Sequence, residues 1–320
     1  DGTGQAVAIF DSGLTGHGDI GSSRIPIKMD FSSGSAKRVR RGDDSFGPGT
    51  LVAGSSGGGG YVTDGVSSGV APAADLMSIK VLDKYGVGLT SNVILAIDWV
   101  IQNRVEYDIR LANLSLGHPA FESYTVDPLC QAVRAMVDAG IVTVVSAGNL
   151  GKTANYPELW GGITSPGTEP SEITVGAANT NGTLTHSDDV TTSYSSRGYT
   201  VPDQLLKPDL VAPGNWIPST LAAGSYLKNN YPELLINLNY MYLSGSSMAT
   251  AFVSGTVALI LEANPDLSPT QVKTILLLTA VKMTQPHILE QGNGFLNAYT
   301  AVKLAEQIDV ASQSLLGNVS

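Results

Sequence analysis

The stretch that decides the fold runs from Leu243 to Ala263 and reads Leu243-Ser-Gly-Ser-Ser-Met-Ala-Thr-Ala-Phe-Val-Ser-Gly-Thr-Val-Ala-Leu-Ile-Leu-Glu-Ala263. From Met248 onward the predicted helix has almost no polar side, and a helix that is apolar all round is buried inside a protein. Gly255 costs about 1 kcal/mol relative to alanine in a helix interior. Its presence therefore indicates that another backbone packs very close to this helix.

The exposed end of this buried helix carries Ser247. The N–H groups of a first helical turn and the positive end of the helix dipole favour an anion there. Two interpretations of the Ser247 hydroxyl follow, a nucleophile beside an oxyanion site or an ordinary helix N-cap. The helix alone favours the N-cap.

The composition is that of a globular protein with an acidic surface. Hydrophobic residues make up 42%, charged residues only 14%, and the net charge is −10. This charge argues against nucleic acid and against anionic membranes as partners. No apolar run approaches the ~18 residues of a membrane span, and no signal peptide is recognisable. Because the sequence begins at Asp1 without Met, we expect a processed or trimmed form.

Cys130 is the single cysteine of the chain. One cysteine excludes an internal disulfide and any cysteine-based metal cluster. Its place on the apolar face of a predicted helix favours a buried structural thiol.

Short apolar runs alternate with amphipathic patterns along the chain. Strands are predicted at 6–10, 27–31, 76–82, 111–116, 141–145, 173–176 and 210–211, and helices begin near 48, 90, 128, 247, 268 and 297. This alternation predicts an α/β fold of three layers, a mostly parallel sheet with helices on both faces. We expect one domain over residues 1–307 and a frayed tail over 308–320.

Two polar residues stand where predicted strands end. Asp11 follows the first strand and Asn149 follows the strand at 141–145. Ligands of parallel sheets bind at the carboxyl ends of strands. The placement of Asp11 and Asn149 therefore favours a functional role for Ser247 over a purely structural one.

Five segments in fixed order carry a family pattern. They are Val7-Ala-Ile-Phe-Asp-Ser-Gly13, Asn113-Leu-Ser-Leu-Gly117, Ser146-Ala-Gly-Asn149, Leu206-Lys-Pro-Asp-Leu-Val-Ala-Pro-Gly214 and Ser244-Gly-Ser-Ser-Met-Ala249. In these segments the chain resembles the subtilisin-like serine peptidases, the subtilases. The resemblance covers essentially residues 1–306, and five motifs in the family's order make it specific.

The resemblance implies a role for each polar residue. Ser247 would attack the scissile carbonyl, and Asn149 with the Ser247 backbone N–H would hold the oxyanion. Asp11 would orient a histidine that serves as general base.

The resemblance also implies a substrate groove. An extended peptide would pair as an added strand between two segments, and a third would wall the pocket for the residue before the scissile bond. These residues are Ser115, Leu116 and Gly117, then Gly86, Val87 and Gly88, and finally Ser146, Ala147 and Gly148.

The chain departs from the family at the general base. The family's His-Gly-Thr-His-Val-Ala-Gly corresponds here to Pro48-Gly-Thr-Leu-Val-Ala-Gly54. Proline is well tolerated at the first position of a helix, but it has no ring nitrogen that accepts a proton. We expect structural or solvated roles for the four histidines that the chain does contain, His17, His118, His186 and His287.

A structural calcium ion is a weaker expectation. Asp19 resembles one calcium ligand of the family, but the loop 55–70 offers only Asp64 as a further carboxylate. No other cofactor is required. The acidic pairs Asp43-Asp44 and Asp188-Asp189 are interpreted as solvated loop charges.

The resemblance therefore implies a secreted, processed serine endopeptidase by descent, with an incomplete catalytic triad and very low activity. Its partners would be extended peptides or proteins, including its own propeptide. The main alternative is a pseudoprotease that binds peptides or regulates without hydrolysing them. An unrelated nucleotide-binding protein is disfavoured because no phosphate-cradling loop is present. The sequence alone leaves open whether Pro48 is natural or introduced.

Overall fold

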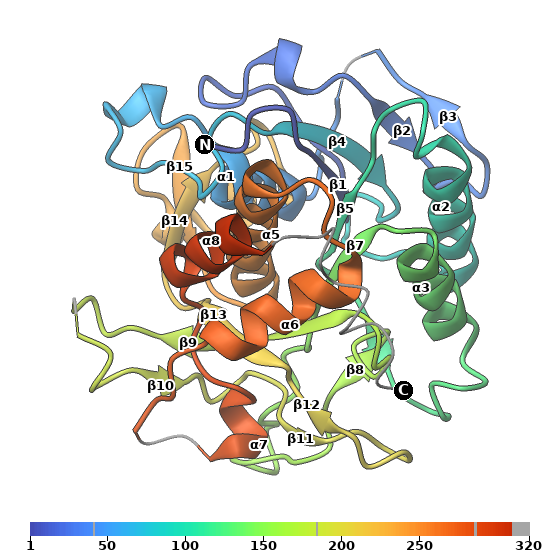
Figure 1. Ribbon diagram of the computed structural model, residues 1–320. Helices are drawn as coiled ribbons and strands as arrows, with labels where there is room; N and C mark the ends of the chain where they lie inside the picture. The colour runs from blue at the N-terminus through green and yellow to red at the C-terminus, as the bar shows by residue number, and fades with distance from the viewer. Residues whose placement is uncertain (41, 184, 285–286, 309–320) are drawn as a thin grey trace.

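The computed structural model describes residues 1–40, 42–183, 185–284 and 287–308. The expected tail beyond residue 308 lies outside the described residues. The chain forms three layers, with a twisted sheet between two layers of helices (Figure 1).

The central sheet has nine strands within the described residues, in the order β10-β9-β7-β5-β1-β4-β2-β3, with β13 also paired to β9. The pairs along β2, β4, β1, β5, β7, β9 and β13 are parallel, and only β3 and β10 pair in antiparallel fashion. The strands are β1 (Ala6–Asp11), β2 (Lys28–Asp30), β3 (Lys37–Arg38), β4 (Asp75–Lys80), β5 (Leu111–Leu114), β7 (Val142–Ser146), β9 (Ile173–Asn179), β10 (Val190–Thr191) and β13 (Leu210–Pro213).

Helices cover both faces of this sheet. α2 (Thr90–Asn103) and α3 (Pro128–Asp138) pack on one face, and α1 (Pro48–Gly57), α5 (Ser246–Ala263), α6 (Pro269–Thr279) and α8 (Ala298–Gln307) lie on the other (Figure 1). Alternate residues of β1 enter different cores: Val7 and Ile9 face α5, whereas Ala8 and Phe10 face α2 and α3. The predicted fold class is therefore confirmed.

The predicted central helix is α5, and it is buried among α1, α8 and the sheet. A Cβ on Gly255 would lie 2.6 Å from Val70 Cβ and 2.8 Å from the carbonyl oxygen of Ser56, which explains the glycine. α5 alone among the described helices is long and apolar enough to cross a membrane, but 72% of that span is buried inside the protein. Its apolar character is thus that of a core helix.

The remaining elements are short and were not predicted. They are strands β6 (His118–Pro119), β8 (Thr164–Ser165), β11 (Gly198–Tyr199), β12 (Leu206–Lys207), β14 (Ile217–Thr220) and β15 (Tyr240–Leu243), helices α4 (Tyr226–Asn230) and α7 (Ile288–Gln291), and 3-10 turns at Ser22–Arg24, Tyr61–Thr63 and Pro232–Leu234. β14 and β15 form a separate two-stranded antiparallel sheet, and β15 leads directly into α5.

Candidate active site

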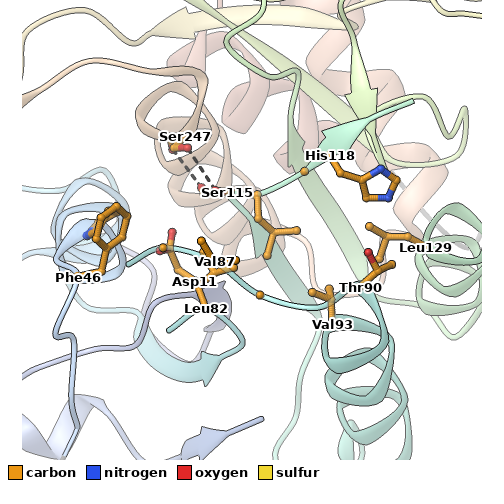
Figure 2. Close-up of a pocket in the computed structure, with 15 residues that line it drawn as sticks. Asp11, Phe46, Leu82, Val87, Thr90, Val93, Ser115, His118, Leu129 and Ser247 are labelled. Carbon is orange, nitrogen blue, oxygen red and sulfur yellow. Dashed lines mark hydrogen bonds between the residues drawn. The ribbon is translucent and has the colours of Figure 1, made fainter. Parts of the chain in front are cut away.

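A groove of about 380 Å³ lies where the carboxyl ends of β1 and β5 meet the N-termini of α1 and α5. Asp11, Pro48 and Ser247 all line it, although they are far apart in sequence. Figure 2 shows Ser247, Asp11 and Phe46 toward one end of the groove and Leu129 and His118 toward the other. Three of the four predicted catalytic positions therefore line one groove, and Asn149 is not among its lining residues.

Ser247 is the second residue of α5, after the N-cap Gly245. Its hydroxyl donates to the carbonyl oxygen of Ser115 at 3.3 Å, and the Ser115 hydroxyl donates to the Ser247 carbonyl at 3.2 Å (Figure 2). No side chain caps the start of α5. The N-cap interpretation of Ser247 is therefore wrong, and its hydroxyl faces the groove.

Asn149 is held beside the same helix end. Its Oδ1 accepts from the Ser246 N–H at 2.9 Å and from the Ser246 hydroxyl at 3.1 Å. Because a backbone N–H can only donate, this contact fixes which side of the amide is oxygen. The amide Nδ2 has no acceptor within the described residues, and neither has the backbone N–H of Ser247. Two free donors at a helix N-terminus form a suitable site for a developing oxyanion.

Asp11 is a buried carboxylate, 2% exposed, at the end of β1. Its Oδ1 accepts from the Ser12 N–H at 2.7 Å and from the Ser12 hydroxyl at 3.1 Å, while Oδ2 is buried and has no partner within the described residues. Burial raises the pKa of Asp11 to about 7, a shift that the Ser12 N–H opposes and the charge of Asp44 reinforces. An imidazole N–H is the type of partner that would satisfy Oδ2.

Asp44 was predicted to be a solvated loop charge, and this is wrong for Asp44. It is 3% exposed and accepts from the N–H groups of Gly47 and Thr50, each at 2.7 Å, and from the Ser12 hydroxyl at 2.7 Å. It thus caps the start of α1 and shares one hydroxyl with Asp11. Burial raises the pKa of Asp44, against the lowering effect of these hydrogen bonds. Asp43, its neighbour, is exposed as expected.

Pro48 is the first residue of α1, where no backbone N–H is needed. It lines the same groove as Asp11 and Ser247, and its side chain has no atom that accepts a proton.

The histidines have other partners. His17 Nε2 contacts the Asn239 carbonyl at 3.0 Å, His186 Nδ1 contacts Asp189 at 2.7 Å, and His287 caps α7. His118 lines the far end of the groove and its Nδ1 contacts the Pro119 carbonyl at 2.9 Å. Within the described residues no histidine nitrogen bonds to Asp11 or Ser247.

Two of the three predicted substrate segments line this groove. Gly86 to Gly88 and Ser115 to Gly117 all line it. Ser146, Ala147 and Gly148 do not; they continue the neighbouring strand β7, and the Ser146 hydroxyl donates to the Leu116 carbonyl at 3.4 Å. The structure thus gathers two of the three substrate segments.

Asp19 does not sit in an oxygen-rich cage. Its Oδ1 accepts from the Val62 N–H at 2.7 Å, and its buried Oδ2 lies 3.8 Å from His17 Nδ1. His17 Nδ1 itself accepts from the Asp19 N–H. Among the described residues no group of three or more His, Cys, Asp or Glu side chains could hold a metal ion. Calcium takes six to eight oxygens, more than the single carboxylate of Asp19 supplies here.

The predictions for Asp189 and Cys130 can also be compared with the structure. Asp189 was predicted to be solvated, but it is 1% exposed and paired with His186, so that prediction is wrong. Cys130 is buried, and burial raises its pKa to about 11. The thiol therefore stays protonated at neutral pH, which agrees with the predicted structural role.

Sequence reasoning missed Asp44, Ser12 and Phe46 as parts of this site. One signal could have identified Asp44, because an acidic residue shortly before a helix that starts with proline can reach the free N–H groups of its first turn. Phe46 offered no such signal, since a single aromatic residue in a loop has no periodicity.

The comparisons with known proteins agree with this geometry. The profile of the Subtilase family matches residues 2–299. Serine protease AprX of Bacillus subtilis is 36% identical over 306 residues, which cover 94% of this chain and 66% of AprX, so the chain spans just under two thirds of that relative. Subtilisin Savinase of Lederbergia lenta is 29% identical, with 94% and 92% covered.

A solved structure is also similar. The crystal structure of a cold-adapted subtilisin-like serine proteinase superposes with a TM-score of 0.67 at 30% identity, covering 93% of this chain and 88% of that one.

Proposed function

The chain belongs to the subtilase family, and we propose that it is a serine endopeptidase in architecture whose hydrolytic step is strongly slowed by Pro48. The observation that carries this proposal is the shared groove, which Asp11, Pro48 and Ser247 line together. In this proposal Ser247 is the nucleophile, Asn149 and the Ser247 N–H are the oxyanion donors and Asp11 is the orienting carboxylate, whereas Pro48 contributes a side chain without a basic atom to the same groove.

The proposed reaction proceeds through an acyl-enzyme on Ser247. The peptide lies extended between the segments 86–88 and 115–117, and the Ser247 oxygen attacks its scissile carbonyl. Asn149 Nδ2 and the Ser247 N–H hold the oxyanion. During this attack the Ser247 hydroxyl must lose its proton, and the leaving amine must then gain a proton. In the family one histidine carries out both transfers, first as general base and then as general acid. In this chain solvent has to carry out both transfers.

Known magnitudes indicate how slow this chain would be. In subtilisin, loss of the general base costs on the order of 10⁶ in turnover, and roughly 10³–10⁴ over the uncatalysed rate remains from the oxyanion hole and binding. Peptide binding itself does not need the base. We therefore propose near-normal binding combined with very slow turnover.

A natural pseudoprotease is the second candidate function. The intact groove and the missing base support it equally well, and the family assignment is the same. In that case the groove would hold a peptide, such as the chain's own propeptide, without releasing it as cleaved product. We propose an extracellular location for either function, as the resemblance to subtilisins implies.

A peptide-hydrolysis assay tests the proposal. Initial rates are compared for the chain, for Pro48→His and for Ser247→Ala, with one set of internally quenched peptides. The expected order is Pro48→His far above the chain, by at least about 10³-fold, with Ser247→Ala at background.

Two outcomes would count against it. Equal rates for the chain and Pro48→His, both at background, would favour the pseudoprotease. Hydrolysis that survives Ser247→Ala would show that Ser247 is not the nucleophile.

A further inference from the structure

A second hollow, of about 500 Å³, opens beside β3, the last strand at one end of the central sheet (Figure 1). It is lined by Ile25, Pro26, Lys28, Arg38, Val39 and Arg40. None of these residues lines the groove at Ser247. Half of the lining side chains are cationic and none is acidic, so the hollow is a strongly basic feature of an acidic chain.

The backbone fixes the three cations relative to one another. Lys28 begins β2 and Arg38 ends β3, and these two strands pair in antiparallel fashion, with Met29 opposite Arg38. The Val39 N–H donates to the Lys28 carbonyl at 2.9 Å, which extends the pairing by one residue. Arg38 and Arg40 flank this Val39. The three basic side chains are therefore held together by hydrogen-bonded strands rather than by a free loop.

The protein itself does not neutralise these cations. The side chains of Lys28, Arg38 and Arg40 donate no hydrogen bond and contact no carboxylate within the described residues. Lys28 is half-buried, and both arginines are exposed. By contrast, Arg134 and Lys207 each contact a carboxylate of this chain. The donors of the basic hollow are therefore available to a ligand.

The acids nearest in sequence are engaged by other groups. Asp30 Oδ1 accepts from the Ser32 N–H at 2.9 Å and from the Ser32 hydroxyl at 2.7 Å. Asp43 contacts Lys80 at 3.2 Å, and Asp44 is buried. Charges farther away than the Debye length, about 8–10 Å at physiological ionic strength, are largely screened. The net charge of −10 therefore does not cancel the local positive field.

Charged side chains on an edge strand can have a simpler purpose, because they prevent pairing with other sheets. That purpose needs only exposure, and Lys37 fulfils it on β3 without lining the hollow. It does not explain why two arginines and a lysine converge on one hollow. Guanidinium groups match phosphate oxygens with paired N–H donors, and a lysine ammonium adds a point charge. This donor set favours an anion with more than one negative charge.

We propose that Lys28, Arg38 and Arg40 form a binding site for a compact multivalent oxyanion of the phosphate class, free or as an ester. The site is separate from the groove and does not depend on the proposed peptidase function. A long polyanion such as nucleic acid is disfavoured, because beyond the hollow it would meet the surface of a chain with net charge −10.

The experiment is a calorimetric titration of the whole chain with inorganic pyrophosphate at pH 7 and low ionic strength, where anion binding is least screened. Orthophosphate, glycerol phosphate and acetate are titrated in the same buffer. We expect saturable binding of pyrophosphate at one site, binding of orthophosphate weaker by at least about tenfold, and no saturation with acetate. Glycerol phosphate binding more tightly than orthophosphate would support an ester as the ligand, and the reverse order would support the free ion.

Two variants with the same change in net charge distinguish a site from a general charge effect. Arg38→Gln removes a cation that lines the hollow. Lys37→Gln removes its neighbour on β3, whose Nζ donates to the Ser33 hydroxyl at 3.0 Å. Both positions are exposed, so both variants should fold as the chain does. We expect Arg38→Gln to weaken pyrophosphate binding at least about tenfold and Lys37→Gln less than about twofold.

Arg38→Lys tests the chemistry of the site, because it keeps the charge and loses the guanidinium fork. Its affinity for pyrophosphate should lie between those of the chain and Arg38→Gln. No saturable binding of pyrophosphate by the chain, or an equal loss in Arg38→Gln and Lys37→Gln, would overturn the inference. Since the measurement reads binding at a site away from Ser247, a failure of the peptidase assay would leave its result unchanged.

Discussion

At the scale of one residue, Asp11 is a buried carboxylate with one oxygen that the described residues leave unsatisfied. Its Oδ2 is buried without a partner among the described residues, and burial raises its pKa to about 7. The charge of Asp44 repels it, and Lys80, its register partner on β4, directs its Nζ to Asp43 instead. An imidazolium would stabilise the ionised Asp11 carboxylate. Without one, ionisation of Asp11 destabilises the folded state of this chain.

The free energy of unfolding should consequently depend on the protonation of Asp11. Because its pKa is raised in the folded state, the contribution is fully present below the unfolded value near 4 and is lost as pH rises through about 7. The loss is on the order of 4 kcal/mol. Denaturant titrations across this range should show stability falling toward alkaline pH.

Asp11→Asn provides the control for that titration. Asparagine cannot ionise, so the stability of the variant relative to the chain should increase as pH rises from about 4 to 8. A difference that stays constant over this range would mean that Asp11 keeps an ordinary pKa. The other buried acids, including Asp44, are present in both proteins and largely cancel.

A substrate could also supply the missing base. Peptides with histidine beside the scissile bond should be cleaved faster by this chain than matched alanine peptides, because the imidazole can enter the space above Pro48. General base catalysis contributes 10²–10⁴-fold, which sets the upper limit of the gain. The preference should disappear in Pro48→His. Equal rates for histidine and alanine peptides would refute this idea.

At the scale of elements, the start of α1 depends on Asp44 rather than on Pro48. Asp44→Ala leaves the N–H groups of Gly47 and Thr50 without their buried acceptor. We expect a loss of about 1–3 kcal/mol in the free energy of unfolding. Asp43→Ala, one residue away and exposed, should cost less than about 1 kcal/mol. Similar losses for the two variants would contradict the capping role.

The loop 57–70 should not depend on calcium. Two backbone donors anchor it to Asp19, the Val62 N–H to Oδ1 and the Gly59 N–H to the carbonyl oxygen. Neither calcium nor a chelator should therefore change Tm, since an ion that binds only the folded state would raise it. A rise of Tm with calcium that is absent in Asp19→Ala would show that an ion displaces the Val62 contact.

The parallel core was predictable from the sequence, and the insertions around it were not. The run that became β1 is apolar up to its final Asp11, and the runs of β5 and β7 are mostly apolar, which is the pattern of strands buried on both faces. β14 contains Pro218, which argues against a central strand, and it pairs only with β15 in a two-stranded sheet. The burial of Asp44 and Asp189 also escaped prediction, because their partners are set by tertiary contacts.

At the scale of the whole molecule, one architecture supports both binding and chemistry. The parallel sheet brings the ends of β1 and β5 to the groove, and the buried α5 presents Ser247 there. Neither the sheet nor the placement of α5 depends on the side chain of residue 48, because this residue is the first of helix α1, where proline is favoured. The fold and the peptide site can therefore persist without the base.

Comparing turnover with binding in Pro48→His tests this account most directly. The dissociation constant of an uncleavable peptide and the kcat for its cleavable counterpart are measured for the chain and the variant. We predict dissociation constants within about threefold of each other and a kcat that rises by at least about 10³. A kcat that stays at background while binding is unchanged would contradict the claim that the base is the only part missing.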